Sequence, residues 1–466
     1  MAINRPPKPV INEAYKRELY LQFSRIGILR LRVKRLMRGF TWFFIIQLLS
    51  TSKRVVDFNI ALLLTILLSP LLIISVLLLK PTGHVLLKTR KLGRWCAPFD
   101  EFAFRVPGHL IGRLIRKTGI SKLPVLFNIW QGDMSFVGPR AALPGELSPR
   151  DKLVRRRYNV RPGLICLWWI RNRANIDYGN EALSDSEYID NQSLMGDLAI
   201  ALRAIPAILY GKGVVTAPDQ LKILGAKIVN LTMQETVDTI LEKLRGHTSN
   251  QICFINADCA NLAYDDREYL GILNQAELTL ADGIGMKLAG KILHQEIKQN
   301  VNGTDLFPRL CAALESTDKK IYLLGAKPGI ANLVKEWIHS NYPQTMISGC
   351  RDGFFSADEN EAVVQAIADS GADILLVALG APKQDKWIHQ NLAKTGVKIA
   401  MGVGGLFDFY SGRIPRAPQW MREMGLEWFY RFYQEPKRMW RRYFVGNFVF
   451  LFRVLKEKFL TKGKSI

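Results

Sequence analysis

The chain has 466 residues, of which 48% are hydrophobic, and its formal net charge is +23. This length allows two or three domains with at least one complete α/β core. The positive charge is concentrated in residues 1–54 and 413–466, where lysine and arginine alternate with aromatic side chains. Such segments bind nucleic acid or an anionic membrane. Because the middle of the chain is nearly neutral and a long apolar run lies near the first segment, the composition favours the membrane and argues against nucleic acid.

Residue spacing argues against several kinds of site. The six cysteines and six histidines show no paired or metal-ligand spacing, so we expect reduced thiols, exposure to the cytoplasm and no zinc site. The sequence contains neither the glycine pattern of dinucleotide-binding folds nor that of P-loop ATPases. The N-terminal region carries too many charges for a cleavable signal peptide.

The N-terminal part predicts contact with a bilayer. Residues 1–52 form a basic segment in which residues 12–38 have the pattern of an amphipathic helix lying on the membrane surface; a solvated helix is the alternative. Residues 60–79 are an apolar run that is long enough to cross a bilayer. Pro70 interrupts this run, and basic residues flank both of its ends. We therefore expect a re-entrant helix with both ends on the cytoplasmic side rather than a straight span.

Residues 53–212 carry short motifs that resemble the bacterial sugar transferases of the monotopic phosphoglycosyl transferase family. The most specific motif is 132–140, and the others lie at 53–58, 69–70, 104–105, 116–119, 123–128 and 161–164. Members of this family transfer a sugar phosphate from a nucleotide sugar to undecaprenyl phosphate, using an adjacent Asp-Glu pair and magnesium. The resemblance implies a membrane-associated, mostly helical domain, which we place at residues 53–215.

The chain departs from this family at the catalytic pair. Ser121 and Lys122 stand where the family has its two acids. A hydroxyl without an adjacent base does not replace a nucleophilic carboxylate, and a lysine repels a metal ion. We therefore expect an inactive domain that keeps its hold on the membrane and a basic surface formed by Arg155, Arg156, Arg157 and Arg161. Magnesium is expected only if this half were active, and otherwise no cofactor is required.

Residues 216–412 alternate between strand and helix patterns. Short apolar runs predict strands at 222–224, 252–256, 278–281, 320–325, 345–349, 373–379 and 398–403. Amphipathic patterns predict helices at 261–273, 330–340 and 359–368. This alternation predicts an α/β fold with a mainly parallel, Rossmann-like sheet covered by helices on both faces. Residues 413–466 form a basic and aromatic appendage to it.

Asp282 is the first candidate functional residue. It follows the predicted strand at 278–281, and the carboxyl ends of parallel strands are where open α/β sheets bind ligands. Gly283 and Gly285 beside it allow close approach by a substrate. The alternative is that Asp282 caps the next helix, because Asp is a favoured N-cap residue.

Glycine-rich loops follow three of the predicted strands, at 324–329, 379–387 and 402–408. Each leads into a helix, whose backbone N–H groups and dipole suit a diphosphate. The candidate binding residues in these loops are Gly325, Lys327, Gly380, Lys383, Gln384 and Gly404. We expect the loops to meet around Asp282 at one edge of the sheet and to bind a nucleotide diphosphate there.

Motifs over residues 220–455 resemble, in the same order, those of the WecG/TagA/CpsF glycosyltransferase family. They lie at 223–232, 281–285, 303–307, 323–329, 380–387, 402–408, 416–418, 425–431 and 435–436. This family transfers a sugar from a UDP-sugar to an undecaprenyl-diphosphate-linked saccharide, with inversion and without a required metal. The resemblance implies that Asp282 is the general base that deprotonates the acceptor hydroxyl. It also implies that the appendage closes over the active site and meets the membrane.

The same resemblance implies roles for further residues. Arg416 and Arg431, with Arg438 behind them, are expected to neutralise the departing UDP in place of a metal. Asp305 lies in the matched segment 303–307 and is expected to bind substrate. A family threonine near the end of the first strand is not matched, and Asn256 is expected to contact the sugar or the acceptor instead.

These observations predict a UDP-sugar-dependent hexosyltransferase of exopolysaccharide or other cell-surface polysaccharide synthesis. We expect it on the cytoplasmic face of the bacterial inner membrane. Its expected partners are a UDP-sugar donor, an undecaprenyl-diphosphate-linked acceptor and an anionic membrane surface, without nucleic acid. One alternative is a bifunctional enzyme whose N-terminal half also transfers a sugar phosphate to undecaprenyl phosphate. Another is a non-catalytic membrane scaffold for polysaccharide assembly. The identities of the sugar and the glycan, and whether the chain forms a homo-oligomer, stay open.

Overall fold

The computed structural model describes residue 33 and residues 51–83, 85–108, 112, 115, 119–146, 151–174, 180–209 and 217–462. The predicted surface helix at 12–38 and nearly all of the basic segment 1–52 lie outside the described residues. The chain divides into two compact units. The first comprises Met1–Cys166 with Ala182–Ile200, and the second comprises Leu167–Glu181 with Ala201–Ile466.

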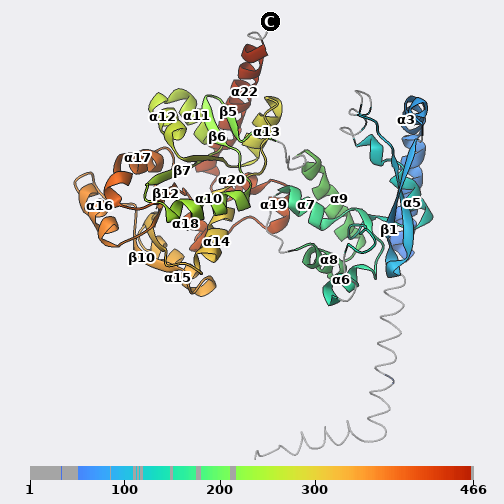
Figure 1. Ribbon diagram of the computed structural model, residues 1–466, viewed down its shortest axis with the longest axis horizontal. Helices are drawn as coiled ribbons and strands as arrows, with labels where there is room; N and C mark the ends of the chain where they lie inside the picture. Colours follow the sequence, from blue (N-terminus) through green and yellow to red (C-terminus); the bar gives the residue numbers. More distant parts are fainter. Residues whose placement is uncertain are drawn as a thin grey trace, which may run out of the picture. The chain divides into compact units, whose positions relative to one another are not determined.

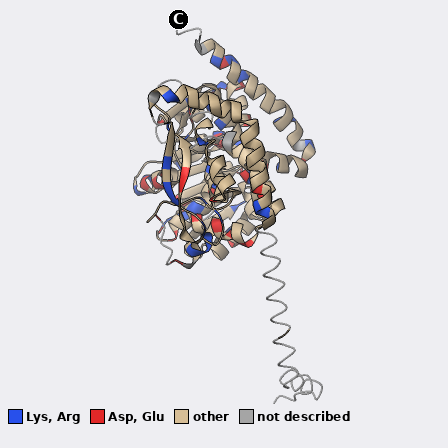
Figure 2. Cartoon of the chain, turned by 90° about the vertical axis from the view of Figure 1, so that its right-hand side faces the viewer, with Lys and Arg blue, Asp and Glu red and all other residues tan. Residues whose placement is uncertain are grey.

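The first unit begins with a bent pair of apolar helices, Thr51–Leu67 and α3 (Ser69–Leu79), whose axes differ by 61°. Pro70 lies in the first turn of α3, where its missing N–H costs no hydrogen bond. Charged side chains occur only near the two ends of the pair (Figure 2). Within the described residues no single helix passes the length and hydropathy test for a membrane span, and this bent pair passes it jointly. The re-entrant path stays a prediction.

The rest of the first unit consists of short helices and two small sheets. Strands β1 (Leu86–Leu92) and β2 (Pro98–Phe104) are antiparallel, and β3 (Ser135–Val137) and β4 (Gly163–Ile165) are parallel. The helices are α5 (Val125–Gln131), α6 (Lys152–Arg157), α8 (Glu181–Asp190) and α9 (Leu194–Leu209), of which α8 and α9 extend across the division into units.

The predicted basic surface of the first unit is wrong for Arg157, and Arg156 and Arg161 have polar partners within the unit. Arg157 is buried and forms an ion pair with Asp185 (3.4 Å). Arg156 is paired with Asp190, and the Arg161 Nε donates to the carbonyl oxygen of Gly132 (2.8 Å). Arg156 and Arg157 are thus paired with carboxylates, and Arg161 is bound to a backbone carbonyl oxygen. The sequence pattern did not indicate these partners. Of the four, Arg155 is exposed.

The second unit is built on a six-stranded parallel sheet with the order β10-β9-β11-β12-β7-β8 (Figure 1). Its strands are β7 (Asn250–Ile255), β8 (Leu278–Ala281), β9 (Lys320–Gly325), β10 (Met346–Arg351), β11 (Ile374–Ala378) and β12 (Ile399–Gly402). Strands β9, β11 and β12 are almost wholly apolar because helices cover both faces of a parallel sheet. The predicted α/β fold is confirmed for this part of the chain.

Alternate strand residues pack against the two helical layers. Ile252 and Phe254 belong to the core shared with α10 (Met233–Arg245), α14 (Gly303–Leu314), α15 (Ile330–Asn341) and α18 (Leu406–Tyr410). Cys253 and Ile255 pack on the opposite face with α11 (Ala257–Asp265), α12 (Arg267–Gln275) and α13 (Ile284–Ile292). On that face α16 (Asn360–Asp369) and α17 (Lys383–Thr395) cover the neighbouring strands. The period of two along each strand produces this division.

Two predicted elements differ from the structure. The strand at 222–224 is β5 (Gln220–Ile223), which pairs antiparallel with β6 (Ala226–Val229) outside the main sheet. The single helix at 261–273 is two helices, because Asp266 ends α11 and its carboxylate accepts from the backbone N–H of Tyr269 (3.0 Å) to cap α12.

The predicted appendage is a series of helices, α19 (Gln419–Glu423), α20 (Glu427–Gln434), α21 (Pro436–Trp440), the π-helical turn Arg441–Val445 and α22 (Gly446–Lys462). Phe450 and Val454 of α22 are buried against α11 and α13. Phe448, Phe452 and Phe459 of the same helix are each about 70% exposed. The appendage therefore seals one side of the core and leaves an apolar surface outside.

A buried ion network fixes α7 (Leu167–Ala174) to this appendage. The two carboxylate oxygens of Glu423 accept from Arg171 Nε (2.9 Å) and Arg203 Nη1 (3.2 Å). Glu423 is fully buried and Arg171 is 3% exposed. Two guanidinium groups therefore share one carboxylate that water does not reach.

We expect Glu423→Gln to lower the free energy of unfolding by about 3 kcal/mol, because it leaves buried arginines without their counter-charge. Thermal unfolding of the detergent-solubilised chain, followed by circular dichroism, measures the change. Glu361→Gln is the control, since its partner Lys394 is exposed and such pairs contribute little. Equal melting temperatures for the Glu423 variant and the unmodified chain would contradict the network's role.

Candidate active site

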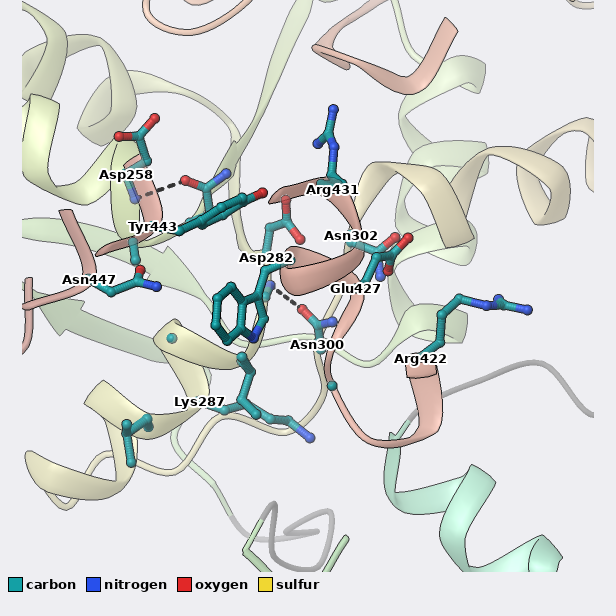
Figure 3. Close-up of a pocket in the computed structure, with 18 of the residues that line it drawn as sticks. Asp258, Asp282, Lys287, Asn300, Asn302, Arg422, Glu427, Arg431, Tyr443 and Asn447 are labelled. Atoms are coloured by element: carbon teal, nitrogen blue, oxygen red, sulfur yellow. Dashed lines mark hydrogen bonds between the residues drawn. The ribbon is translucent and has the colours of Figure 1, made fainter. Parts of the chain in front are cut away.

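A cavity of about 440 Å³ lies at the carboxyl ends of β7 and β8. The loops after these strands form its floor, and residues of α13, α14 and the appendage form its walls (Figure 3). Seven of the predicted site residues line it: Asn256, Asp282, Gly283, Gly285, Asp305, Arg416 and Arg431. The edge of the sheet where open α/β folds bind ligands thus carries a cavity lined by many charged residues.

Asp282 lies between the loops that follow β7 and β8. Its backbone N–H donates to the carbonyl oxygen of Ile255 (2.9 Å), and Gly283 N–H donates to the side-chain oxygen of Asn300 (2.5 Å). Gly283, with φ of 88°, is the N-cap residue of α13, and no side chain caps this helix. The alternative that Asp282 is a helix cap is therefore wrong. Its carboxylate accepts no hydrogen bond from any described residue and lines the cavity.

The surroundings of Asp282 favour its protonated form. Burial raises the pKa of its carboxyl group to about 6, and the neighbouring carboxylates of Glu427 and Asp305 add to this rise. The guanidinium groups of Arg442 and Arg431 act in the opposite direction. The carboxylate is therefore ionised at neutral pH and accepts a proton more readily than an ordinary aspartate.

Arg416 connects two elements of the cavity wall. Its Nη2 donates to Asp305 Oδ1 (2.6 Å) and its Nε donates to Glu427 Oε1 (3.1 Å). These carboxylates raise the pKa of Arg416 despite its burial. Because two acids already surround the guanidinium, Arg416 holds α14 and α20 together, and its charge is compensated before any ligand binds.

Arg431 has no such compensation. Its guanidinium lies over the ring of Phe409 (4.9 Å), and its buried Nε has no hydrogen-bond partner. A Cβ atom added at Gly405 would come within 2.7 Å of Arg431 Nη2, so the glycine makes room for this side chain. Within the described residues no carboxylate forms an ion pair with it. Arg431 is therefore available to an anion, whereas the Arg438 side chain lies outside the described residues.

The polar residues predicted to bind substrate have structural partners as well. The side-chain oxygen of Asn256 accepts from the backbone N–H groups of Asp258 and Cys259 (both 3.0 Å) and caps α11. Asp305 Oδ2 accepts from Asn302 Nδ2 (2.8 Å), and its Oδ1 is bound to Arg416. Both residues line the cavity while they hold its loops in place.

The glycine-rich loops do not all meet at Asp282. Lys327 and Lys383 line a second cavity of about 760 Å³ at the carboxyl ends of β9 and β11. This is a correction of the predicted convergence, and the strand order explains it, because β12 separates β11 from β7. Asp408 lines the second cavity, and Phe409, the next residue of α18, lines the first.

Four residues of the predicted loops line neither of these two cavities: Gly325, Gly380, Gln384 and Gly404. The side-chain oxygen of Gln384 accepts from the backbone N–H groups of Gly380 (3.1 Å) and Gly404 (2.9 Å). Gln384 is buried and therefore joins the loops after β11 and β12. Gly325 packs against Ala378, where a Cβ atom would lie 2.6 Å from the backbone.

Sequence reasoning missed several residues of the first cavity. Lys287 on α13, Arg422 on α19, Glu427 on α20 and Arg173 on α7 all line it. Burial lowers the pKa of Lys287 to about 8. Lys287 follows Asp282 by five positions on the helix that begins at the site, so the sequence could have indicated that it lies nearby. Arg173 and Arg422 carried no such signal, because only the packing of α7 and α19 brings them to the site.

Comparison with known proteins gives two family matches. Residues 109–211 match the Bacterial sugar transferase family, and residues 221–464 match the Glycosyl transferase WecG/TagA/CpsF family. The first match covers Ser121 and Lys122, and the second covers Asp282 and the appendage.

Individual relatives match the second region. The N-acetylglucosaminyldiphosphoundecaprenol N-acetyl-beta-D-mannosaminyltransferase of Bacillus subtilis (strain 168) is 35% identical over 191 residues, which are 41% of this chain and 73% of the relative. A protein of the same name from Staphylococcus aureus (strain MRSA252) is 30% identical over 240 residues, or 51% of this chain and 92% of the relative. The chain therefore belongs to the WecG/TagA/CpsF family of glycosyl transferases.

Proposed function

We propose that this protein is an inverting glycosyltransferase that moves a sugar from a UDP-sugar to a saccharide linked to undecaprenyl diphosphate. The names of the mannosaminyltransferase relatives support the acceptor class, because they specify N-acetylglucosamine on diphosphoundecaprenol. An N-acetylhexosamine is the first donor sugar to test for the same reason. The product would enter a cell-surface polysaccharide such as an exopolysaccharide.

The observation that carries the proposal is the unpaired carboxylate of Asp282 in a cavity with uncompensated cations. In a single displacement, the acceptor hydroxyl oxygen forms a bond to the anomeric carbon while the bond from that carbon to the diphosphate oxygen breaks. Asp282 takes the proton of the hydroxyl, and the diphosphate leaves with the electron pair. Arg431, which has no carboxylate partner among the described residues, stabilises the negative charge that develops on the leaving group.

The second cavity supports a site for the nucleotide. Lys327 and Lys383 are exposed there; Lys327 lies three residues before α15 and Lys383 is the first residue of α17, and the N-terminal N–H groups of such helices favour a phosphate. Consecutive residues of α18 line the two cavities, and Arg431 lies against the same helix. We infer that UDP occupies the second cavity and extends its diphosphate past Arg431, so that the sugar reaches Asp282.

The exposed apolar residues support attachment to a membrane. Phe448, Phe452 and Phe459 of α22, with Lys456 and Lys458 on the same helix, suit the cytoplasmic face of an anionic bilayer. The bent apolar helices of the first unit suit the same surface. Holding the enzyme at the bilayer raises the effective concentration of its lipid-linked acceptor.

We propose that the first unit has no second transferase activity. Lys122, at a position where the resembling family has an acid, forms an ion pair with Glu101 (3.2 Å). A lysine at this position adds positive charge where the family has a carboxylate, which disfavours a bound metal ion. We propose that this unit serves for membrane attachment.

Asp282→Asn is expected to lower the rate of UDP release at least about a hundredfold, the usual scale for loss of a general base. The assay contains the full chain in detergent, an N-acetylhexosaminyl-UDP donor and a short-chain diphosphate-linked N-acetylglucosamine acceptor, and it measures UDP and UMP separately. Asp358→Asn is the control, because Asp358 is exposed and lines neither cavity. Near-normal UDP release by the Asp282→Asn variant would remove Asp282 from this role, and UMP release that survives in that variant would indicate the bifunctional alternative.

The pH profile tests the electrostatics of the base. Since Asp282 must be ionised to accept the proton, kcat/KM should fall as the pH drops through about 6, the raised pKa of its carboxyl group. Glu427→Gln removes a charge that raises this pKa, so it should move the acidic limb to lower pH. Arg442→Gln should move it to higher pH. Profiles with the same acidic limb in all three proteins would show that another group limits the rate.

Lys327→Gln and Lys383→Gln should each raise the KM for the UDP-sugar roughly tenfold, as expected for a lost charge-assisted phosphate contact. The KM for the acceptor should stay within about twofold, because that substrate does not enter the second cavity in this arrangement. Lys320→Gln is the matched control, since Lys320 is an exposed lysine at the opposite end of β9. Initial-rate measurements with one substrate varied at a time give the two KM values. An unchanged donor KM in both variants would place the nucleotide elsewhere.

A further inference from the structure

Helix α7 brings an arginine from outside the matched glycosyltransferase region into the cavity of Asp282. The match to the WecG/TagA/CpsF family begins at residue 221, whereas α7 lies within the segment 109–211 that matches bacterial sugar transferases. By its contacts α7 nevertheless belongs to the compact unit that contains the glycosyltransferase sheet. Arg173 and Ala174, its last two residues, line the cavity.

The position of Arg173 is well defined by its neighbours. Two residues earlier, Arg171 is locked to the buried carboxylate of Glu423 on α19. The guanidinium of Arg173 stacks on the ring of Trp169 (4.0 Å), and its Nη1 donates to the carbonyl oxygen of Ala207 (3.3 Å). No carboxylate among the described residues pairs with it. A stacked, preorganised guanidinium with N–H groups to spare is suited to bidentate binding of a phosphate.

Arg422 supplies a second cation to the same wall. It precedes Glu423 on α19, the helix that packs on α7, and it lines the same cavity. Its buried Nε has no hydrogen-bond partner. Arg173 of α7 and Arg422 of α19 thus both line this cavity from two helices that are in contact, while Arg431 lies against α18.

The proposed reaction involves two diphosphates, one in the donor and one in the acceptor. Arg431, Lys327 and Lys383 lie where the donor diphosphate is proposed to bind, which leaves the α7–α19 wall for the acceptor. Ile284 and Leu288 of α13 line the same cavity and are 36% and 44% exposed. Apolar side chains at the edge of a cationic cavity match an anion that continues into a hydrocarbon chain.

We propose that Arg173, together with Arg422, binds the diphosphate of the lipid-linked acceptor. The inference rests on the proposed function and extends it, since the segment ahead of the glycosyltransferase core then completes the acceptor site. A chain that lacked α7 would keep Asp282 and the nucleotide cavity, and it would bind the acceptor more weakly. Arg173 acts as a substrate-binding residue and takes no proton.

The kinetic test uses the full chain in detergent with Arg173→Gln. The KM for the diphosphate-linked acceptor should rise about tenfold or more, because a charge-assisted contact is lost, while the KM for the UDP-sugar stays within about twofold. Arg173→Lys keeps the charge without the planar fork and should recover part of the loss. Arg267→Gln, an exposed arginine on α12 outside both cavities, is the control for net charge. An unchanged acceptor KM, or a rise confined to the donor KM, overturns the proposal.

A binding measurement separates this proposal from the proposed function. Titration calorimetry with farnesyl diphosphate should show binding to the unmodified chain that weakens about tenfold or more in Arg173→Gln, with farnesol as the control that lacks the anion. Equal binding of farnesyl diphosphate by both proteins overturns the proposal whatever the activity. Arg173-dependent binding in a protein that releases no UDP would support the lipid-diphosphate site and contradict the glycosyl transfer. Matching thermal unfolding curves confirm that the variant is folded.

Discussion

The ion bridge through Arg416 joins two elements in the wall of the cavity that contains Asp282. Its guanidinium joins Asp305 on α14 (2.6 Å) to Glu427 on α20 (3.1 Å), and thereby ties the C-terminal appendage to the sheet domain. Because both carboxylates are engaged, the bridge closes the cavity without using the carboxylate of Asp282. The side chains of the bridge are partly shielded from solvent, and both of its hydrogen bonds are charge-assisted.

The charged residues around Asp282 pair with one another and leave the Asp282 carboxylate without an ion pair among the described residues. Glu427 and Asp305 face Arg416, and Asp258 faces Arg442 (3.1 Å), so the ion pairs surround Asp282 without including it. Burial and the nearby carboxylates then raise its pKa to about 6. This value suits a base that must be ionised at neutral pH and still bind a proton in the transition state.

The division of the chain by folding differs from its division by family. The sugar transferase match extends to residue 211, yet α7 and the last part of α9 belong to the glycosyltransferase unit. The Arg171–Glu423–Arg203 network fixes α7 in this unit. Moving α7 away would leave the buried Glu423 carboxylate without a counter-charge, which is strongly destabilising. Helix α7 therefore matches the sugar transferase family but lines the cavity of the glycosyltransferase unit.

Local features could be predicted from the residues alone: the parallel α/β alternation and the place of Asp282 after a buried strand. The family resemblance added that Ser121 and Lys122 stand where related proteins have an acidic pair. These follow from periodicity and motif spacing, which act over a few residues. The packing of the whole chain was needed to see that Asp282 is no helix cap, that Lys327 and Lys383 line a separate cavity, and that Arg156 and Arg157 form ion pairs. It also decided that Arg173 and Arg422 reach the site. Strand order and ion pairs bring together residues that are far apart in the chain. The pattern of residues within one segment does not indicate which distant strand or charge that segment contacts.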